Sequence, residues 1–131
     1  MELERNYHIF YQLCSGEFPE INKEIMLEAD ASKYFYINQG MLKIDKVDDN
    51  AEMRDTKKAF DILMFTHQQQ MDLFKITSAI ANWGNTQWKQ RPREEQAEPE
   101  STEDLEIAAK LYGVDTDALV KGLTKPRIKV Y

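Results

Sequence analysis

The chain has 131 residues, enough for one ordinary domain or for part of a larger one, and too few for two full domains. Its 17 Lys and Arg against 23 Asp and Glu give a net charge of −6, and this acidic balance argues against a nucleic-acid module. With 42% hydrophobic and 31% charged residues the composition is that of a globular protein, and the single cysteine excludes an internal disulfide.

Neither a membrane span nor a secretion signal is predicted. No apolar run approaches the roughly 18 to 20 residues that cross a bilayer. Residues 1–5, MELER, lack the basic start and apolar stretch of a signal peptide. We therefore expect a cytoplasmic protein with no membrane partner and, from its charge, no nucleic-acid partner.

Helical spacing dominates the beginning of the chain. Apolar residues at steps of four, three and four predict a helix from Leu3 to Cys14, and the glycine after Ser15 ends it: Leu3, Tyr7, Phe10 and Cys14. A short helix is expected over 20–27 after Pro19, with Ile21, Ile25 and Met26 facing inward.

The spacing then changes to alternation. Phe35 and Ile37 alternate before Asn38-Gln39-Gly40, and Leu42 and Ile44 alternate after it. Because glycine accepts the positive φ of a tight turn, this segment predicts a short hairpin.

Two capping boxes introduce the next helices, Asp49 with Glu52 and Thr66 with Gln69. The first helix is expected to face the core with Met53, Thr56, Phe60 and Leu63. The second, from Gln68 to Trp83, is the longest, at about 24 Å. It carries two adjoining stripes, one of Leu73, Ile76, Ile80 and Trp83, the other of Met71, Phe74, Ser78 and Ala81.

A compositional break follows at residues 89–101, which contain two prolines and seven charged residues and predict a long exposed loop. Ser101 or Thr102 then caps a helix that ends at Gly113, with one face formed by Leu105, Ala108, Ala109 and Tyr112. Asp115 starts a last short helix that ends before Pro126. Residues 127–130 alternate like a strand and are expected to pair near Trp88.

The usual signatures of an enzyme site are missing from the sequence. None of the five glycines is followed by lysine, so a phosphate-binding P-loop is not predicted. His8 and Cys14 are out of phase on their helix, and the Asp115–Asp117 pair lacks the glycine of a calcium loop, so no metal site is expected. The elements together predict a mainly α fold, an irregular helical subdomain with one or two very short β-strands.

Four strings resemble, in order, segments of the myosin heavy-chain motor domain. Residues 4–13, ERNYHIFYQL, look like the helix after the switch I region, and residues 59–66, AFDILMFT, resemble the segment AFDILGFT with Met64 in place of the usual glycine. Residues 93–99, REEQAEP, match a loop of muscle-type conventional myosins, and residues 125–130, KPRIKV, resemble the segment PRVKV that leads into the cardiomyopathy loop. The chain is therefore identified as a member of the myosin motor-domain family, of the conventional (class II) muscle type.

The resemblance implies an actin-activated ATPase whose parent motor binds ATP and Mg²⁺ and has a coiled-coil tail. Residues 1–131 would form the upper jaw of the actin-binding cleft, after switch I and before switch II, so no catalytic, cofactor-binding or metal-binding residue is expected within them. Where the family continues with glycine after Val130, this chain has Tyr131, so the regulatory position of the cardiomyopathy loop is expected to lie outside it. The implied partners are the actin filament, tropomyosin and the remainder of the myosin head, and the implied location is the thick filament of the myofibril.

Six residues carry the expected contact with actin. Residues 91–103 resemble loop 4, which approaches actin and tropomyosin, and two basic residues match the base of the cardiomyopathy loop. The expected actin-binding residues are Arg127, Lys129, Glu94, Glu95, Glu98 and Glu100.

The competing interpretation is a free-standing helical adaptor that binds another protein through its Phe- and Tyr-rich faces. A nucleic-acid binder built on the basic C-terminal residues is opposed by the acidic total and by the lack of an aromatic platform.

Overall fold

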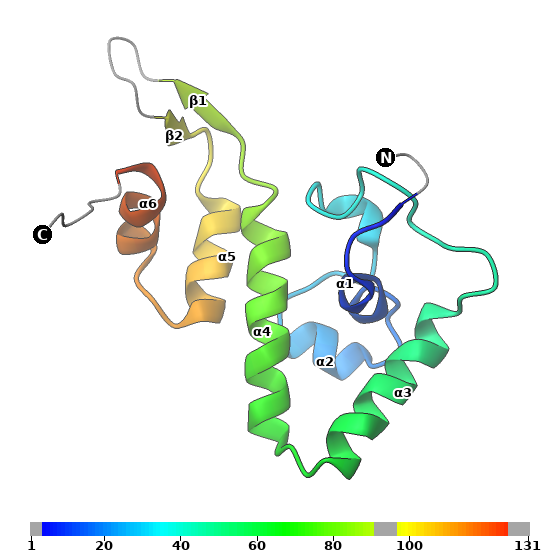
Figure 1. Cartoon of the computed structure of the whole chain (residues 1–131). Coiled ribbons are helices and arrows are strands. Elements are labelled where there is room, and N and C mark those ends of the chain that lie inside the picture. The colour runs from blue at the N-terminus through cyan, green and yellow to red at the C-terminus, as the bar shows by residue number, and fades with distance from the viewer. Residues whose placement is uncertain (1–3, 91–96, 126–131) are drawn as a thin grey trace, which may run out of the picture.

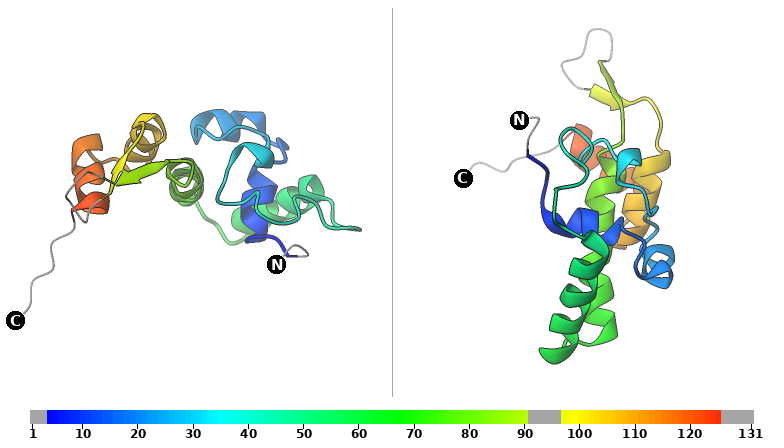
Figure 2. Two further views of the ribbon diagram at one scale, coloured as in Figure 1. Left: turned by 90° about the horizontal axis from the view of Figure 1, so that it is seen from above. Right: turned by 90° about the vertical axis from the view of Figure 1, so that its right-hand side faces the viewer.

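The computed structural model of the chain describes residues 4–90 and 97–125. One long helix, α4 (His67–Trp83), runs through the middle, and Figure 1 shows the other helices on its two sides. On one side lie α1 (His8–Leu13), α2 (Pro19–Glu24), the 3-10 turn η1 (Ala31–Lys33) and α3 (Asp49–Ile62), and on the other lie α5 (Glu103–Tyr112) and α6 (Thr116–Thr124). The view from above separates the same two groups (Figure 2). Strands β1 (Trp88–Gln90) and β2 (Ala97–Pro99) form the antiparallel pair beyond α4, so the prediction of a mainly α fold with very short strands is confirmed.

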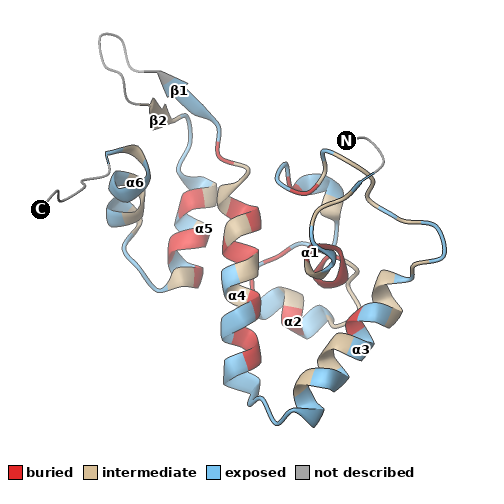
Figure 3. Ribbon diagram, viewed as in Figure 1, coloured by how far each residue is buried: buried red, intermediate tan, exposed pale blue. Residues whose placement is uncertain are grey.

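Two apolar cores flank α4. The larger core lies between α4 and the N-terminal helices and includes Phe10, Ile25, Met53 and Phe74. The smaller core joins α4 to α5 through alanines, Ala79 and Ala108, which allow the two helices to pack closely. Figure 3 shows that the buried residues of α4 extend along both of these contacts.

The start of α4 is capped as predicted. The Thr66 hydroxyl accepts a hydrogen bond from the Gln69 amide at 3.1 Å, and the Gln69 side chain accepts one from the Thr66 amide at 2.9 Å. One orphan amide of the first turn, that of Gln69, and the amide of the cap residue are thereby satisfied. The stripe that contains Met71 and Phe74 is buried, as the spacing predicts.

The other predicted stripe of α4 is only partly buried. Ile80 and Trp83 pack into the cores, but Leu73 and Ile76 are 44% and 48% exposed. In Figure 1, α5 lies along the upper part of α4 only, so the lower part of α4 is covered on the side of α2 but not on the side of α5.

The N-terminal helix is shorter than its apolar spacing predicts, because it begins at His8. The described residues before it are not helical, and the Glu4 carbonyl accepts a hydrogen bond from the Met41 amide at 3.1 Å. Tyr7, predicted on the inner stripe, is exposed, whereas the Tyr11 hydroxyl accepts from the Asn6 amide at 2.9 Å and donates to the Ile37 carbonyl at 2.7 Å.

The predicted hairpin over 35–44 is wrong, since none of these described residues forms a strand. Side chains from elsewhere take the backbone groups that a ladder would use. The Phe35 amide donates to Asn85 Oδ1 at 2.7 Å, and the Ile37 carbonyl accepts from Tyr11. The sequence pattern also predicts Met26 on the inner face of a helix over 20–27, and this is wrong. The helix α2 ends at Glu24, and Met26 turns outward with a φ of 54°.

The cap of α3 is Asp48, not the predicted Asp49. Asp48 Oδ1 accepts from the amides of Asn50 and Ala51, because the Asp49 carboxylate is already held by both Nη atoms of Arg5 at 2.8 and 2.9 Å. Along α3 only Met53 is buried, and Leu63, predicted to face inward, is 68% exposed.

The predicted loop over 89–101 is wrong at its two ends, which pair as β1 and β2. Trp88 lies opposite Pro99, so it pairs within this hairpin, and the predicted strand over 127–130 lies outside the described residues. The predicted end of α5 and cap of α6 are confirmed: Gly113 ends α5 in the left-handed conformation, and Asp115 caps α6 by accepting from the Ala118 amide. Of the two caps predicted for α5, Thr102 stands at the N-cap position but makes no side-chain cap hydrogen bond, and Leu111 is buried where Tyr112 is only half-buried.

Thr66→Ala is expected to destabilise the fold by about 1 kcal/mol, because it leaves an amide at the start of α4 without its cap. Urea denaturation of the chain measures this change. The matched control is Thr77→Ala inside the same helix, where the hydroxyl only donates back to the Leu73 carbonyl. Equal losses for the two variants would contradict the capping role.

Glu17→Gln is expected to lower stability at neutral pH and to have a fading effect in acid. Hydrogen bonds to the Glu17 carboxylate, first from Arg54 at 2.7 Å and then from Asn50 at 3.0 Å, lower the pKa of this group. A lowered pKa stabilises the fold above the unfolded pKa of about 4.3, and that stability is lost as the pH falls through the folded value. Denaturation from pH 7 to pH 3 tests this, and a difference that stays constant over the range would contradict it.

Candidate functional site

The β1–β2 hairpin stands beyond the end of α4, away from both cores (Figure 1). Its register places Lys89 opposite Glu98, and the Lys89 ammonium lies 3.4 Å from the Glu98 carboxylate. The Glu100 amide donates to the Gln87 carbonyl at 2.8 Å and continues the pairing past β2. Charged side chains are thus presented on an arm whose backbone is held by its own hydrogen bonds.

The acidic surface continues into α5. Glu103, Asp104 and Glu106 occupy the first turn, where the positive end of the helix dipole favours negative charge. The Thr102 hydroxyl donates to Glu106 at 3.2 Å, and Ser101 Oγ accepts from the Glu103 amide at 3.4 Å. Partial burial, and then the neighbouring charge of Glu103, raises the pKa of Asp104.

Basic residues lie next to this acidic stretch. α6 packs against α5 and contacts β2, and its exposed Lys121 and Lys125 lie in and just after its last turn. Cations are favoured at a helix C-terminus. Acidic and basic surfaces therefore meet at the hairpin end of the molecule.

The structure describes two of the six residues that the sequence predicts for the actin contact. Glu98 lies in β2 beside Lys89, and Glu100 is exposed immediately after β2. The hairpin brings these two residues together with the acidic start of α5. The other four, Glu94, Glu95, Arg127 and Lys129, lie outside the described residues.

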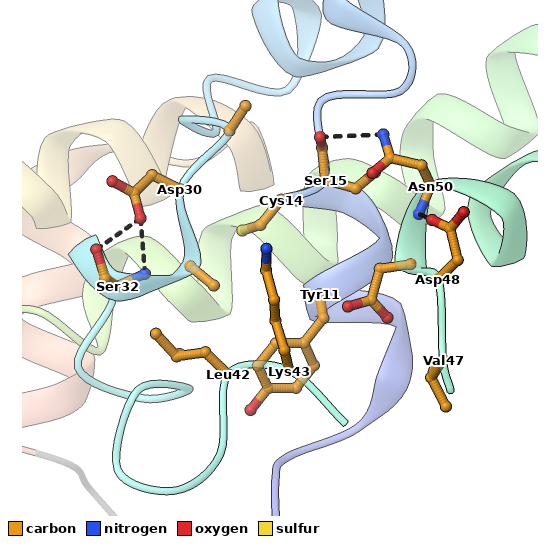
Figure 4. Close-up of a pocket in the computed structure, with 13 residues that line it drawn as sticks. Tyr11, Cys14, Ser15, Asp30, Ser32, Leu42, Lys43, Val47, Asp48 and Asn50 are labelled. Atoms are coloured by element: carbon orange, nitrogen blue, oxygen red, sulfur yellow. Dashed lines mark hydrogen bonds between the residues drawn. The ribbon is translucent and has the colours of Figure 1, made fainter. Parts of the chain in front are cut away.

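A cavity of about 500 Å³ opens between the end of α1, η1 and residues 42–50 (Figure 4). Asp30 Oδ1 accepts from the Ser32 hydroxyl at 2.6 Å and from its amide at 3.0 Å, and these bonds lower the pKa of Asp30. Asp48 caps α3, and Asp49 is paired with Arg5. The carboxylates of this cavity are therefore engaged in holding the backbone and a buried arginine.

The thiol in the same cavity, that of Cys14, is buried. Burial, and then the charge of Asp30, raises the pKa of Cys14 to about 12. The nucleophilic thiolate is accordingly almost absent at neutral pH. This cavity offers neither an activated nucleophile nor a poised base among its described lining residues.

Across residues 4–90 and 97–125, no three His, Cys, Asp or Glu side chains gather so as to hold a metal ion. Within that described part, no helix has both the length and the apolar character needed to cross a membrane.

The whole chain, residues 1–131, matches the family described as myosin head (motor domain). The chain belongs to this family. It is 44% identical to Myosin-1 of Caenorhabditis elegans over 127 residues, which is 97% of this chain and 7% of that protein. It is 45% identical to Myosin-3 of the same organism and to Myosin-3 of Caenorhabditis briggsae, again over 97% of this chain and 6% of each relative. The chain thus spans less than a tenth of the length of these relatives, and it is part of a myosin motor domain.

Sequence reasoning missed two features of this myosin segment. It did not find the pairing of Lys89 with Glu98 across β1 and β2. It also did not expect an exposed apolar turn before α4, for which the methionine at position 64 was the available signal.

Cys14, the single cysteine of the chain, is expected to react with a disulfide reagent at least about a hundredfold more slowly in the folded chain than in urea, because burial suppresses its thiolate. Absorbance at pH 8 follows the reaction. Equal rates with and without urea would show that Cys14 is accessible and would contradict the described packing of α1.

Proposed function

We propose that this segment works in an actin-activated, ATP-driven motor of the muscle type, as the upper jaw of its actin-binding cleft. The family membership supports the motor, and the REEQAEP string at residues 93–99 supports the muscle type. Under this proposal the segment acts in the thick filament during contraction, next to actin and tropomyosin.

The hairpin is the observation that carries the actin-facing role. It extends beyond α4 and joins two charged surfaces of opposite sign, the acidic stretch that includes Glu98 and Glu100 and the basic end of α6. Exposed charges of this kind steer encounter and fix orientation more than they add affinity, and salt screens them. Such a projecting charged arm suits contact with a charged filament.

ATP and Mg²⁺ belong, in this proposal, to other parts of the motor. A nucleotide needs a glycine-rich turn followed by lysine, and none of the five glycines here has that neighbour. Each carboxylate of the described cavity already accepts a hydrogen bond: Asp30 from Ser32, Asp48 from the Asn50 amide and Asp49 from Arg5. The described residues therefore do not fit a nucleotide or metal site, and in this proposal the role of the segment is mechanical.

The proposed contact with actin predicts that reversing one of its charges lowers the actin affinity of the complete motor, and that the size of this loss depends on salt. Arg127→Glu is expected to weaken co-sedimentation with actin by about tenfold at low salt and by clearly less at about 0.2 M salt, because ions screen exposed charges. The matched control is Lys58→Glu, the same charge reversal at an exposed position of α3, which lies away from the hairpin.

The control is expected to bind actin like the native motor at both salt concentrations. An Arg127→Glu motor with native affinity would overturn the proposed contact. A loss of equal size at low and high salt would assign the effect to damaged folding, and would contradict the electrostatic role.

A further inference from the structure

The α4 helix buries two polar side chains against the end of α2. Ser78 is completely buried and Asn82 is 3% exposed. Ser78 Oγ donates to the Ile25 carbonyl at 2.6 Å. Asn82 Nδ2 donates to the Met26 carbonyl at 3.3 Å and to Ser78 Oγ at 3.1 Å. We call Ser78 and Asn82 the polar hook, because together they hold two successive carbonyls of another element.

The segment that the polar hook holds is a strained helix end. The Leu27 amide donates to the Asn22 carbonyl at 3.0 Å, which is the longer of the two bonds of a Schellman motif along the chain. Met26 stands at the position of this motif that usually takes glycine, and its φ is 54°. A strained conformation persists where the surrounding structure fixes it, and the bond from Asn82 contributes to this here.

The same helix end is tied to α1. Asn22 Nδ2 donates to the Leu13 carbonyl at 2.8 Å and to the Leu27 carbonyl at 3.1 Å. A series of hydrogen bonds therefore connects the end of α1, the end of α2 and α4. Each such bond adds little net stability, because the unfolded groups bond to water, but a buried carbonyl that loses its partner is costly. The bonds thus oppose sliding of α4 against α2 more than apolar contacts alone do.

The polar hook lies in the half of α4 that leads to the hairpin. Asn82 is in the last turn of α4, and β1 begins at Trp88. Just after the helix, the Asn85 side chain accepts from the Phe35 amide at 2.7 Å and donates to the Lys33 carbonyl at 2.9 Å. A displacement at the base of the hairpin is therefore passed to α2 and α1 through directed bonds.

We propose that Ser78 and Asn82 are positioning residues that transmit movement of the hairpin to α1 through the end of α2. This inference rests on the proposed function, in which the hairpin meets actin and ATP is bound elsewhere in the motor. Part of the acceleration of ATP turnover by actin then passes through the polar hook.

Ser78→Ala in the complete motor tests this coupling. It removes one hydroxyl, at a small change in volume, and leaves the Ile25 carbonyl without its bond. ATP turnover without actin, followed by phosphate release, is expected to equal that of the native motor, as is the affinity for actin in co-sedimentation without ATP. Turnover at saturating actin is expected to fall about fivefold, which is the order of effect of breaking one link of a coupling network.

Two further variants complete the test. Asn82→Leu removes the bond to the Met26 carbonyl with an apolar side chain of similar size, and it is expected to lower the saturating rate in the same way. Thr77→Ala is the matched control, because its hydroxyl only donates back to the Leu73 carbonyl within α4. This control is expected to keep the native rate at saturating actin.

Native turnover at saturating actin in both Ser78→Ala and Asn82→Leu would overturn the coupling role. An equal proportional fall in turnover without actin would also overturn it, because general damage to the fold lowers both rates. The proposed function fails differently, through an unmodified motor that actin does not accelerate, and that result would refute both proposals.

Discussion

The fold depends on polar side chains of α4 that are buried and bonded to the backbone of its neighbours. The Ser78 hydroxyl donates to the Ile25 carbonyl at 2.6 Å, and Asn82 Nδ2 donates to the Met26 carbonyl at 3.3 Å. These carbonyls follow α2, where a helix leaves its last acceptors unpaired. Because an unsatisfied buried acceptor costs about 1 to 3 kcal/mol, these bonds set the position of α2 against α4. On the other side, the contact of Ala79 with α5 leaves little room for either helix to shift.

This constraint makes α4 the common support of the two surfaces described above. The hairpin follows its C-terminal end, and the exposed apolar turn of residues 62–65 precedes its N-terminal end. A helix of 17 residues is about 26 Å long and bends little, so the two surfaces keep a fixed separation. In residues 4–90 and 97–125 the chain thus offers rigid packing between two exposed surfaces.

Local signals in the sequence predicted the helices and most of their ends. The capping box of Thr66 and Gln69, the cap at Asp115 and the glycine at position 113 each act over a few residues, and the structure contains all three. Two of the failures share one cause, which is contact between residues far apart in the chain. Arg5 binds the Asp49 carboxylate, 44 positions along the chain, so Asp49 does not cap α3. The Phe35 amide donates to Asn85, 50 positions along the chain, so it does not pair in a hairpin.

The sequence by itself determined the helical class, the resemblance to the myosin family and the charge pattern of the hairpin end, because periodicity, caps and short matching strings are local properties. Only the tertiary structure decided which apolar residues are buried. Leu73 and Leu63 sit at helical spacing like Phe74 and Met53, yet they are exposed, because no other described element covers them. Burial depends on where the neighbouring helices end, and that placement follows from long-range contacts such as the bond from Ser78 to Ile25.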